Sequence, residues 1–104
     1  MNLKEFANLI STLGLPLSYY QFHEEVSVPF LIYYNPSASS IAADNKVIAM
    51  KIQVILEVYF VEKDLNLESQ IENLLEENEI YYSDIDEIYI ETESVFKRSY
   101  YITL

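Results

Sequence analysis

The stretch Asp44–Phe60, DNKVIAMKIQVILEVYF, decides the fold of this chain. Every even-numbered position from 48 onward is apolar, while polar residues such as Lys51 and Glu57 fall on odd positions. An alternation with period two predicts a β-strand, and typical strands have only about 5–6 residues. We therefore expect one unusually long strand that begins near Lys46 and ends near Glu62.

Such a strand is too long for a compact domain of 104 residues. At about 3.3 Å per residue, residues 46–60 would span roughly 50 Å. A globular chain of this length has a radius of gyration of only about 13 Å. Either a bulge folds the strand back, or one end projects as an arm that needs a partner. This pattern favours a protein that works by assembly over an enzyme.

Length and composition indicate one domain, residues 1–104, in which 51% of the residues are hydrophobic, enough for a modest core. Cysteine is absent, which excludes disulfides and thiolate metal sites. The sequence contains no run of about 18 apolar residues that would predict a membrane helix. We therefore expect no membrane contact, no signal peptide and no cofactor.

The charge balance is acidic, with 17 Asp and Glu residues against 6 Lys and Arg and a formal net charge of −11. Every charged residue from Asp64 to Glu93 is a carboxylate. A protein that binds nucleic acid non-specifically needs the opposite sign, because phosphate contacts dominate its affinity. We therefore expect no nucleic-acid partner.

Helix signals lie on both sides of the long strand. Asn2 predicts the N-cap of a first helix, Glu5 completes a capping box, and Gly14 ends the helix. Asp64 or Asn66 caps a second helix that runs to about residue 77. The buried side chains expected where these helices meet the long strand are Phe6, Ile10, Ile52, Val54, Leu56, Ile71 and Leu75.

The remaining segments predict shorter strands. These are residues 17–22, 30–34, 80–82 and 94–104, with a polar loop at 35–45 and a turn at 83–87. The expected order is α-β-β-β-α-β-β. This is an α+β fold in which two helices pack on one face of a largely antiparallel sheet.

Three carboxylates on the second predicted helix form a candidate electrostatic face. Glu68, Glu72 and Glu76 recur every four residues and so share one side of the helix. This face suits a cation or a basic partner, or it is simply solvated. Catalysis is not indicated, because His23 is the only histidine and the sequence has neither a nucleophile elbow nor a phosphate-binding glycine loop.

The order of several short motifs carries a family resemblance. Gly14-Leu-Pro16 ends the first helix, Pro29–Tyr34 (PFLIYY) forms a strand, and Ala43-Asp-Asn45 leads into the long strand. With the following VEKDLNLESQIENLLEENEIYY, this layout resembles the small tail-completion proteins of phages and prophages of Gram-positive bacteria. These are also called tail-terminator or head–tail joining proteins.

This resemblance implies a part of the virion without catalytic activity. Members of that group form a ring, expected here to be a hexamer, which caps the tail tube and joins it to the head. The implied partners are other copies of the chain, the major tail tube protein and head connector proteins. The implied location is the host cytoplasm during assembly and then the virion.

The projecting end of the long strand and the loop before it would supply one side of each contact between subunits. The candidate self-association residues are Asn35, Pro36, Ser37, Ile41, Asp44, Asn45, Lys46 and Lys51. A different class of function stays open. The carboxylates between Asp64 and Glu93 would also suit an acidic inhibitor that mimics DNA and binds a basic nucleic-acid-binding protein.

Overall fold

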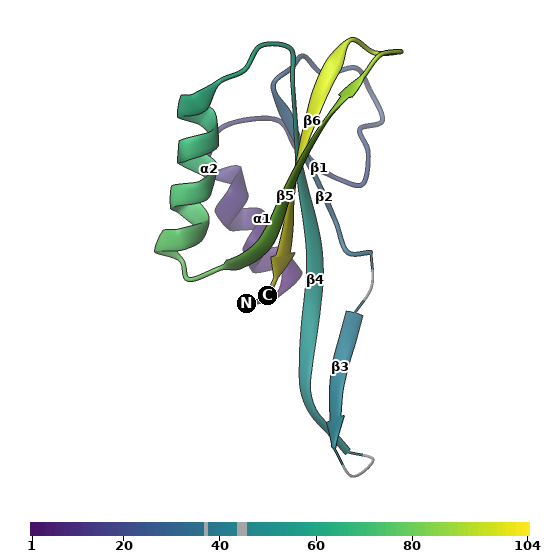
Figure 1. The fold of residues 1–104 in the computed structure, drawn as a ribbon, viewed down its shortest axis with the longest axis vertical. Coiled ribbons are helices and arrows are strands. Elements are labelled where there is room, and N and C mark those ends of the chain that lie inside the picture. Colours follow the sequence, from purple (N-terminus) through teal and green to yellow (C-terminus); the bar gives the residue numbers. More distant parts are fainter. Residues whose placement is uncertain (37, 44–45) are drawn as a thin grey trace.

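The computed structural model describes the backbone of residues 1–36, 38–43 and 46–104, and the side chains of residues 1–36 and 52–104. The elements follow in the order α1 (Leu3–Ser11), β1 (Leu17–Tyr19), β2 (Phe30–Tyr34), β3 (Ala38–Ala43), β4 (Lys46–Phe60), α2 (Leu65–Glu77), β5 (Tyr81–Ile90) and β6 (Val95–Thr103). Two helices and a mostly antiparallel sheet confirm the expected α+β class (Figure 1).

The sheet is built around β4, which lies at its centre. The strand order is β1-β2-β4-β6-β5, and β3 pairs with β4 outside this path. Among the described strands, only β1 and β2 run parallel to each other, whereas β4 is antiparallel to β2, β3 and β6. The predicted long strand is confirmed, although it ends at Phe60, two residues before the end expected near Glu62.

Both helices begin at the predicted caps. The Asn2 side chain accepts a hydrogen bond from the Glu5 N–H at 2.8 Å, and the Glu5 carboxylate accepts one from the Asn2 N–H at 2.9 Å. Asp64 accepts from the Leu67 N–H at 3.1 Å. Gly14 follows α1 with a φ of +79°, a conformation that glycine adopts without steric cost. The capping chemistry therefore fixes where each helix starts.

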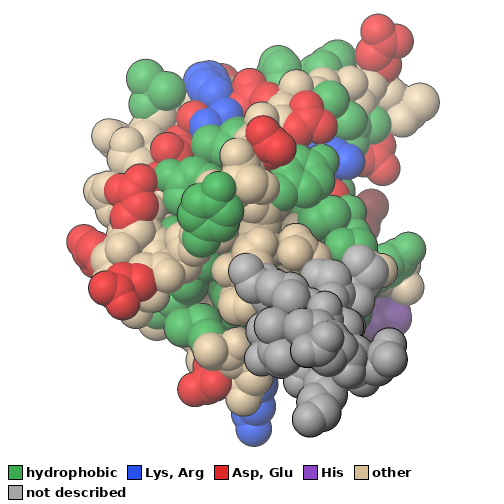
Figure 2. Space-filling model, turned by 60° about the horizontal axis from the view of Figure 1, so that its bottom comes forward, with side chains coloured by type: hydrophobic (Ala, Val, Ile, Leu, Met, Phe, Trp, Pro, Cys, Tyr) green, Lys and Arg blue, Asp and Glu red, His purple; other side chains and the backbone are tan. Residues whose placement is uncertain are grey.

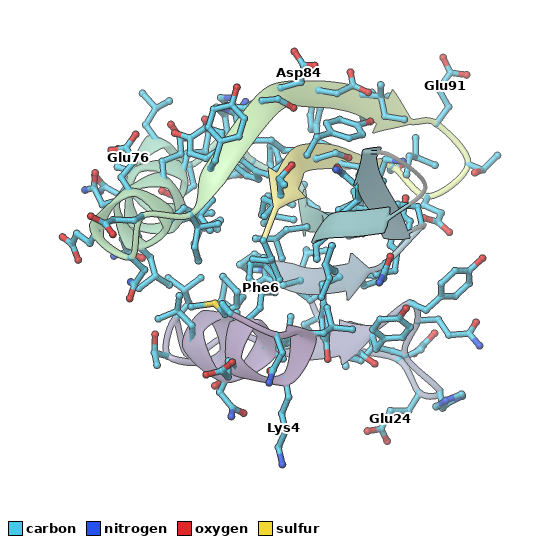
Figure 3. The ribbon with its side chains drawn as sticks, turned by 90° about the horizontal axis from the view of Figure 1, so that it is seen from below. Lys4, Phe6, Glu24, Glu76, Asp84 and Glu91 are labelled. Atoms are coloured by element: carbon cyan, nitrogen blue, oxygen red, sulfur yellow. The ribbon has the colours of Figure 1, made fainter. Side chains whose placement is uncertain are left out.

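The core lies between the two helices and one face of the sheet. Phe6 points from α1 toward this face, whereas Lys4 points away from it (Figure 3). Of the side chains expected in the core, all are fully or almost fully buried except Ile52, which packs at the margin. The core cluster consists of Phe6, Ile10, Leu31, Val54, Leu56, Val58, Phe60, Ile71, Leu75, Ile80, Tyr100 and Ile102.

Two expectations about strands were wrong. Residues 38–43, predicted as part of a loop, form β3, because β4 extends beyond the body of the sheet and offers this segment an edge for hydrogen bonding. Residues 83–87, predicted as a turn, belong to the ten-residue strand β5. Their carboxylates are tolerated because β5 lies at the end of the sheet and most of its side chains are exposed.

Candidate self-association site

The part of β4 that leaves the body of the sheet forms an arm with β3. From Gln53 onward β4 pairs with β6, and from Ile55 with β2 as well. Among the described residues, 46–51 pair with β3 alone. We call β3 together with residues 46–51 the arm. It projects away from the helices and beyond both termini (Figure 1).

The dimensions of the molecule reflect this arm. Its extents are 49 × 29 × 23 Å and its radius of gyration is 14.9 Å, larger than the value of about 13 Å expected for a compact chain of this length. The long axis matches the roughly 50 Å expected for residues 46–60. Of the two alternatives for the long strand, the structure therefore has the projecting arm.

The predicted self-association residues lie along the arm where they are described. Asn35 and Pro36 lie at its base, Ile41 on β3, and Lys46 and Lys51 at the two ends of its β4 segment. Ser37, Asp44 and Asn45 lie outside the described residues. At the base, the Asn35 N–H donates a hydrogen bond to the Tyr19 hydroxyl at 3.2 Å. This hydrogen bond connects the base of the arm to β1.

The predicted electrostatic face does not point wholly into solvent. Arg98 on β6 reaches α2 with its guanidinium 3.4 Å from Glu68 and 3.5 Å from Glu72. Glu76 instead accepts a hydrogen bond from the Tyr82 hydroxyl at 3.0 Å. The three carboxylates therefore bind the helix to the sheet rather than forming one exposed acidic surface.

Arg98 is the centre of a network that links α2, β5 and β6. Its guanidinium also lies 3.1 Å from Glu87 and donates to the Tyr100 hydroxyl at 3.0 Å. Lys63 adds contacts to Glu68 at 2.8 Å and Glu87 at 3.0 Å. We call these residues the Arg98 cluster: Lys63, Glu68, Glu72, Glu87, Arg98 and Tyr100.

Pairing shifts the pKa of two members of this cluster, Glu87 and Lys63. Partial burial alone would raise the pKa of Glu87, but hydrogen bonds from Lys63 and Arg98 outweigh it and hold that pKa below its ordinary value. Hydrogen bonds to Glu68 and Glu87 likewise raise the pKa of Lys63. The charged forms of Glu87 and Lys63 are therefore their stable forms at neutral pH.

Replacing Arg98 with methionine should lower the free energy of unfolding by about 2–3 kcal/mol at neutral pH. The Arg98 side chain is only 15% exposed, and its removal leaves three carboxylates facing one another with Lys63 as the remaining cation of the cluster. Urea denaturation followed by circular dichroism measures the change. Lys4→Met removes the same charge from an exposed position on α1 and should change stability little.

The effect of Arg98→Met should shrink in acid. A carboxyl whose pKa is lowered on folding stabilises the native state above its ordinary pKa, and this contribution is lost as the pH falls through the native-state pKa. Glu87 is such a group. If the two proteins differ as much at pH 3 as at pH 7, the loss comes from packing and not from charge.

A second cluster, which sequence reasoning missed, lies on the sheet face opposite the helices. Glu57 is only 6% exposed and accepts hydrogen bonds from the hydroxyls of Tyr59 at 2.8 Å and Tyr34 at 3.4 Å. The Lys97 ammonium lies 3.6 Å from its carboxylate. The available signal was that Glu57 is the single carboxylate within residues 46–60.

The stability of the protein should fall above about pH 10. Burial, followed by the hydrogen bond to Glu57, raises the pKa of Tyr59. Burial and the Glu72 carboxylate raise the pKa of Tyr100 above its ordinary value, although Arg98 opposes this. An acid whose pKa is raised on folding stabilises the native state below its ordinary pKa, and this is lost as the pH rises through the native-state pKa.

Replacing both tyrosines with phenylalanine should therefore flatten the alkaline part of the stability curve. Chemical denaturation at a series of pH values between 8 and 11 measures the slope. Tyr81→Phe, at an exposed position, is the matched control and should leave the slope unchanged. An unaltered slope in the double variant would assign the alkaline loss to other groups.

No group of three His, Cys, Asp or Glu residues that could hold a metal ion occurs in the part of the chain that the structure describes. In the same part, no helix is long and apolar enough to cross a membrane.

Comparison with known proteins adds no family to this description. No protein-family model matches the chain, and no curated protein matches it.

Proposed function

We propose that this protein is a non-enzymatic structural subunit of a phage or prophage virion. Identical subunits form a ring, a hexamer by analogy with the group that the sequence resembles, at the head-proximal end of the tail. The ring contacts the major tail tube protein on one side and head connector proteins on the other. Subunits gather in the host cytoplasm and remain in the virion.

The arm is the observation that carries this proposal. A two-stranded hairpin is at best marginally stable alone in water. Here β3 and residues 46–51 pair only with each other among the described residues. Their outer edges present backbone donors and acceptors that a neighbouring chain can pair. An element of this kind is stabilised by contact with another subunit, and head-to-tail contacts of one kind form a ring when the rotation between subunits closes.

The distribution of charge bears on the rival function, a DNA-mimic inhibitor. Acidic side chains are spread over the face seen in Figure 2, with few basic ones among them. However, Glu68, Glu72 and Glu87 are paired within the chain in the Arg98 cluster. Carboxylates that stand for phosphates have to face the partner, so this pairing favours the structural role.

The proposal is tested by deleting the coding sequence from the phage or prophage that encodes it. Electron microscopy of the resulting lysate should show heads and tails that fail to join, and supplying the wild-type protein from a plasmid should restore complete particles. Joined, infectious particles in the absence of the protein would overturn the proposal. The rival function instead requires tight, salt-sensitive binding of the monomer to a basic nuclease or repressor.

A further inference from the structure

Strand β5 forms a long open edge of the sheet. It is ten residues long and pairs only with β6 among the described residues. The edge strand at the other end of the body, β1, has three residues. An open edge strand carries a row of unpaired N–H and C=O groups, which can pair with an added strand.

The side chains of β5 do little to prevent such pairing. Tyr81, Ile85, Ile88 and Tyr89 are large and apolar, and they are between 40% and 67% exposed. The strand contains neither Lys nor Pro, residues that commonly block edge-to-edge contact. Its one irregularity is a register shift near its start, between Tyr82 and Asp84. The remaining length from Asp84 to Ile90 is regularly paired with β6.

Two carboxylates give this edge its charge. Asp84 and Asp86 are exposed and pair across the ladder with Tyr101 and Ser99, so they lie on the face without helices. Asp84 points outward from the strand (Figure 3). Glu87, in contrast, is held by Arg98 and Lys63. The edge therefore suits an apolar strand that brings cations.

The arm has the complementary composition. Its β3 strand, ASSIAA, consists almost entirely of small residues, and its β4 segment, KVIAMK, is apolar with a lysine at each end. Lys46 and Lys51 are two of the six basic residues in the chain. If β3 were added to a β5 edge, these lysines would lie two strands, or about 10 Å, from the carboxylates of that edge. An extended lysine side chain and an aspartate side chain together span about 10 Å. The Ala and Ser side chains of β3, which would lie between them, are small enough to allow this.

The β3 strand of the arm and the β5 strand also lie toward opposite lateral edges of the sheet. At Ile52, β4 pairs with Ala38 of β3 on one edge, while its carbonyl accepts the Leu104 N–H on the other at 2.9 Å. β5 lies beyond β6 on this second side. A contact between the arm of one subunit and β5 of the next therefore uses two different surfaces, as a ring requires.

We propose that the outer edge of β5 receives the arm of a second copy of this chain by strand addition, with β3 beside residues 84–90 and with Lys46 and Lys51 facing Asp84 and Asp86. The sheet then continues from subunit to subunit. This inference rests on the proposed self-association and names the surface that meets the arm.

Cross-linking tests the contact directly, because the chain has no cysteine and each variant carries a single thiol. Variants Ser39→Cys and Ser40→Cys on β3 are mixed in turn with Asp84→Cys and Asp86→Cys on β5 and oxidised. At least one mixture should give a disulfide-linked dimer, since adjacent strands bring Cα atoms within disulfide range. Glu24→Cys, exposed outside the sheet, is the control partner and should give none.

Charge reversal on β5 is the second test. Asp84→Lys with Asp86→Lys changes the net charge from −11 to −7, which weakens the overall repulsion between subunits and by itself favours association. We expect the opposite: at least a tenfold loss of rings by native mass spectrometry, with thermal unfolding unchanged. Glu24→Lys with Glu25→Lys makes the same charge change elsewhere and should preserve rings. Adding Lys46→Glu and Lys51→Glu to the β5 variant should restore them.

The outcomes separate this inference from the proposed function. If the wild-type protein forms rings but no β5 cysteine cross-links and the β5 charge reversal leaves rings intact, the arm docks elsewhere and only this inference fails. If the wild-type protein forms no ring even in the presence of tail tubes, the proposed function fails with it. Cross-linking to β5 that accompanies ring formation supports both.

Discussion

Replacing Leu56 with alanine should lower the free energy of unfolding by about 2–5 kcal/mol. Leu56 is completely buried at the centre of β4, where it pairs across the sheet with Tyr33 on one side and Tyr100 on the other. Leu56 belongs to the core cluster, which includes residues of both helices and of β2, β4 and β6, so removing its side chain leaves a cavity in the core. Urea denaturation measures the loss.

Gln53→Ala is the matched control within the same strand. Gln53 lies three residues earlier and so projects from the opposite face of β4, where it pairs with Thr103 and no helix covers it. We expect this substitution to change stability by less than about 0.5 kcal/mol. Equal losses from the two variants would mean that the register of β4 is misassigned.

The parts of the fold that sequence predicts well are those with local signals. The period-two pattern of residues 46–60 identified β4 together with the face that it buries, because alternation assigns each side chain to one side of a strand. The caps at Asn2 and Asp64 involve atoms three residues apart. Such signals are complete within a short window of sequence, so no knowledge of distant contacts is needed.

Strand β3 was not predicted, and of β5 only the start was predicted, at residues 80–82, because the formation of both strands depends on a neighbouring strand. The segment ASSIAA has little intrinsic preference for extended structure, and β3 exists because β4 runs beyond the sheet and supplies a partner. In β5, acidic residues favour a turn, but one edge of the strand pairs with β6 while the carboxylates project into solvent or toward Arg98.

The two charged clusters could not be found from spacing. Arg98 meets Glu72 across 26 residues of sequence, and Tyr34 meets Glu57 across 23. The helical period correctly placed Glu68 and Glu72 on one side of α2. It could not reveal that this side faces β6, because the register between helix and sheet is set by the packing of the core.

Under the proposed function, changing Lys46 and Lys51 together to glutamate should abolish tail completion while leaving the fold intact. Both residues lie on the arm, beyond the part of β4 that pairs with β2 and β6, so thermal unfolding should match the wild type. The net charge falls from −11 to −15, and the arm loses the cations through which one acidic subunit can attract another. Electron microscopy of lysates from a deletion strain that carries the variant should show unjoined heads and tails.

Two comparisons separate the arm from the charge of the whole molecule. Lys46→Arg with Lys51→Arg retains both cations and should support normal particles. Lys4→Glu adds negative charge at an exposed position of α1, which is not part of the arm, and should also be tolerated. Screening at about 0.15 M salt limits interactions between exposed charges to roughly 8 Å, so a substitution outside the contact should not reproduce a loss at the contact itself. Particles that mature normally with both lysines reversed would remove these residues from the subunit interface.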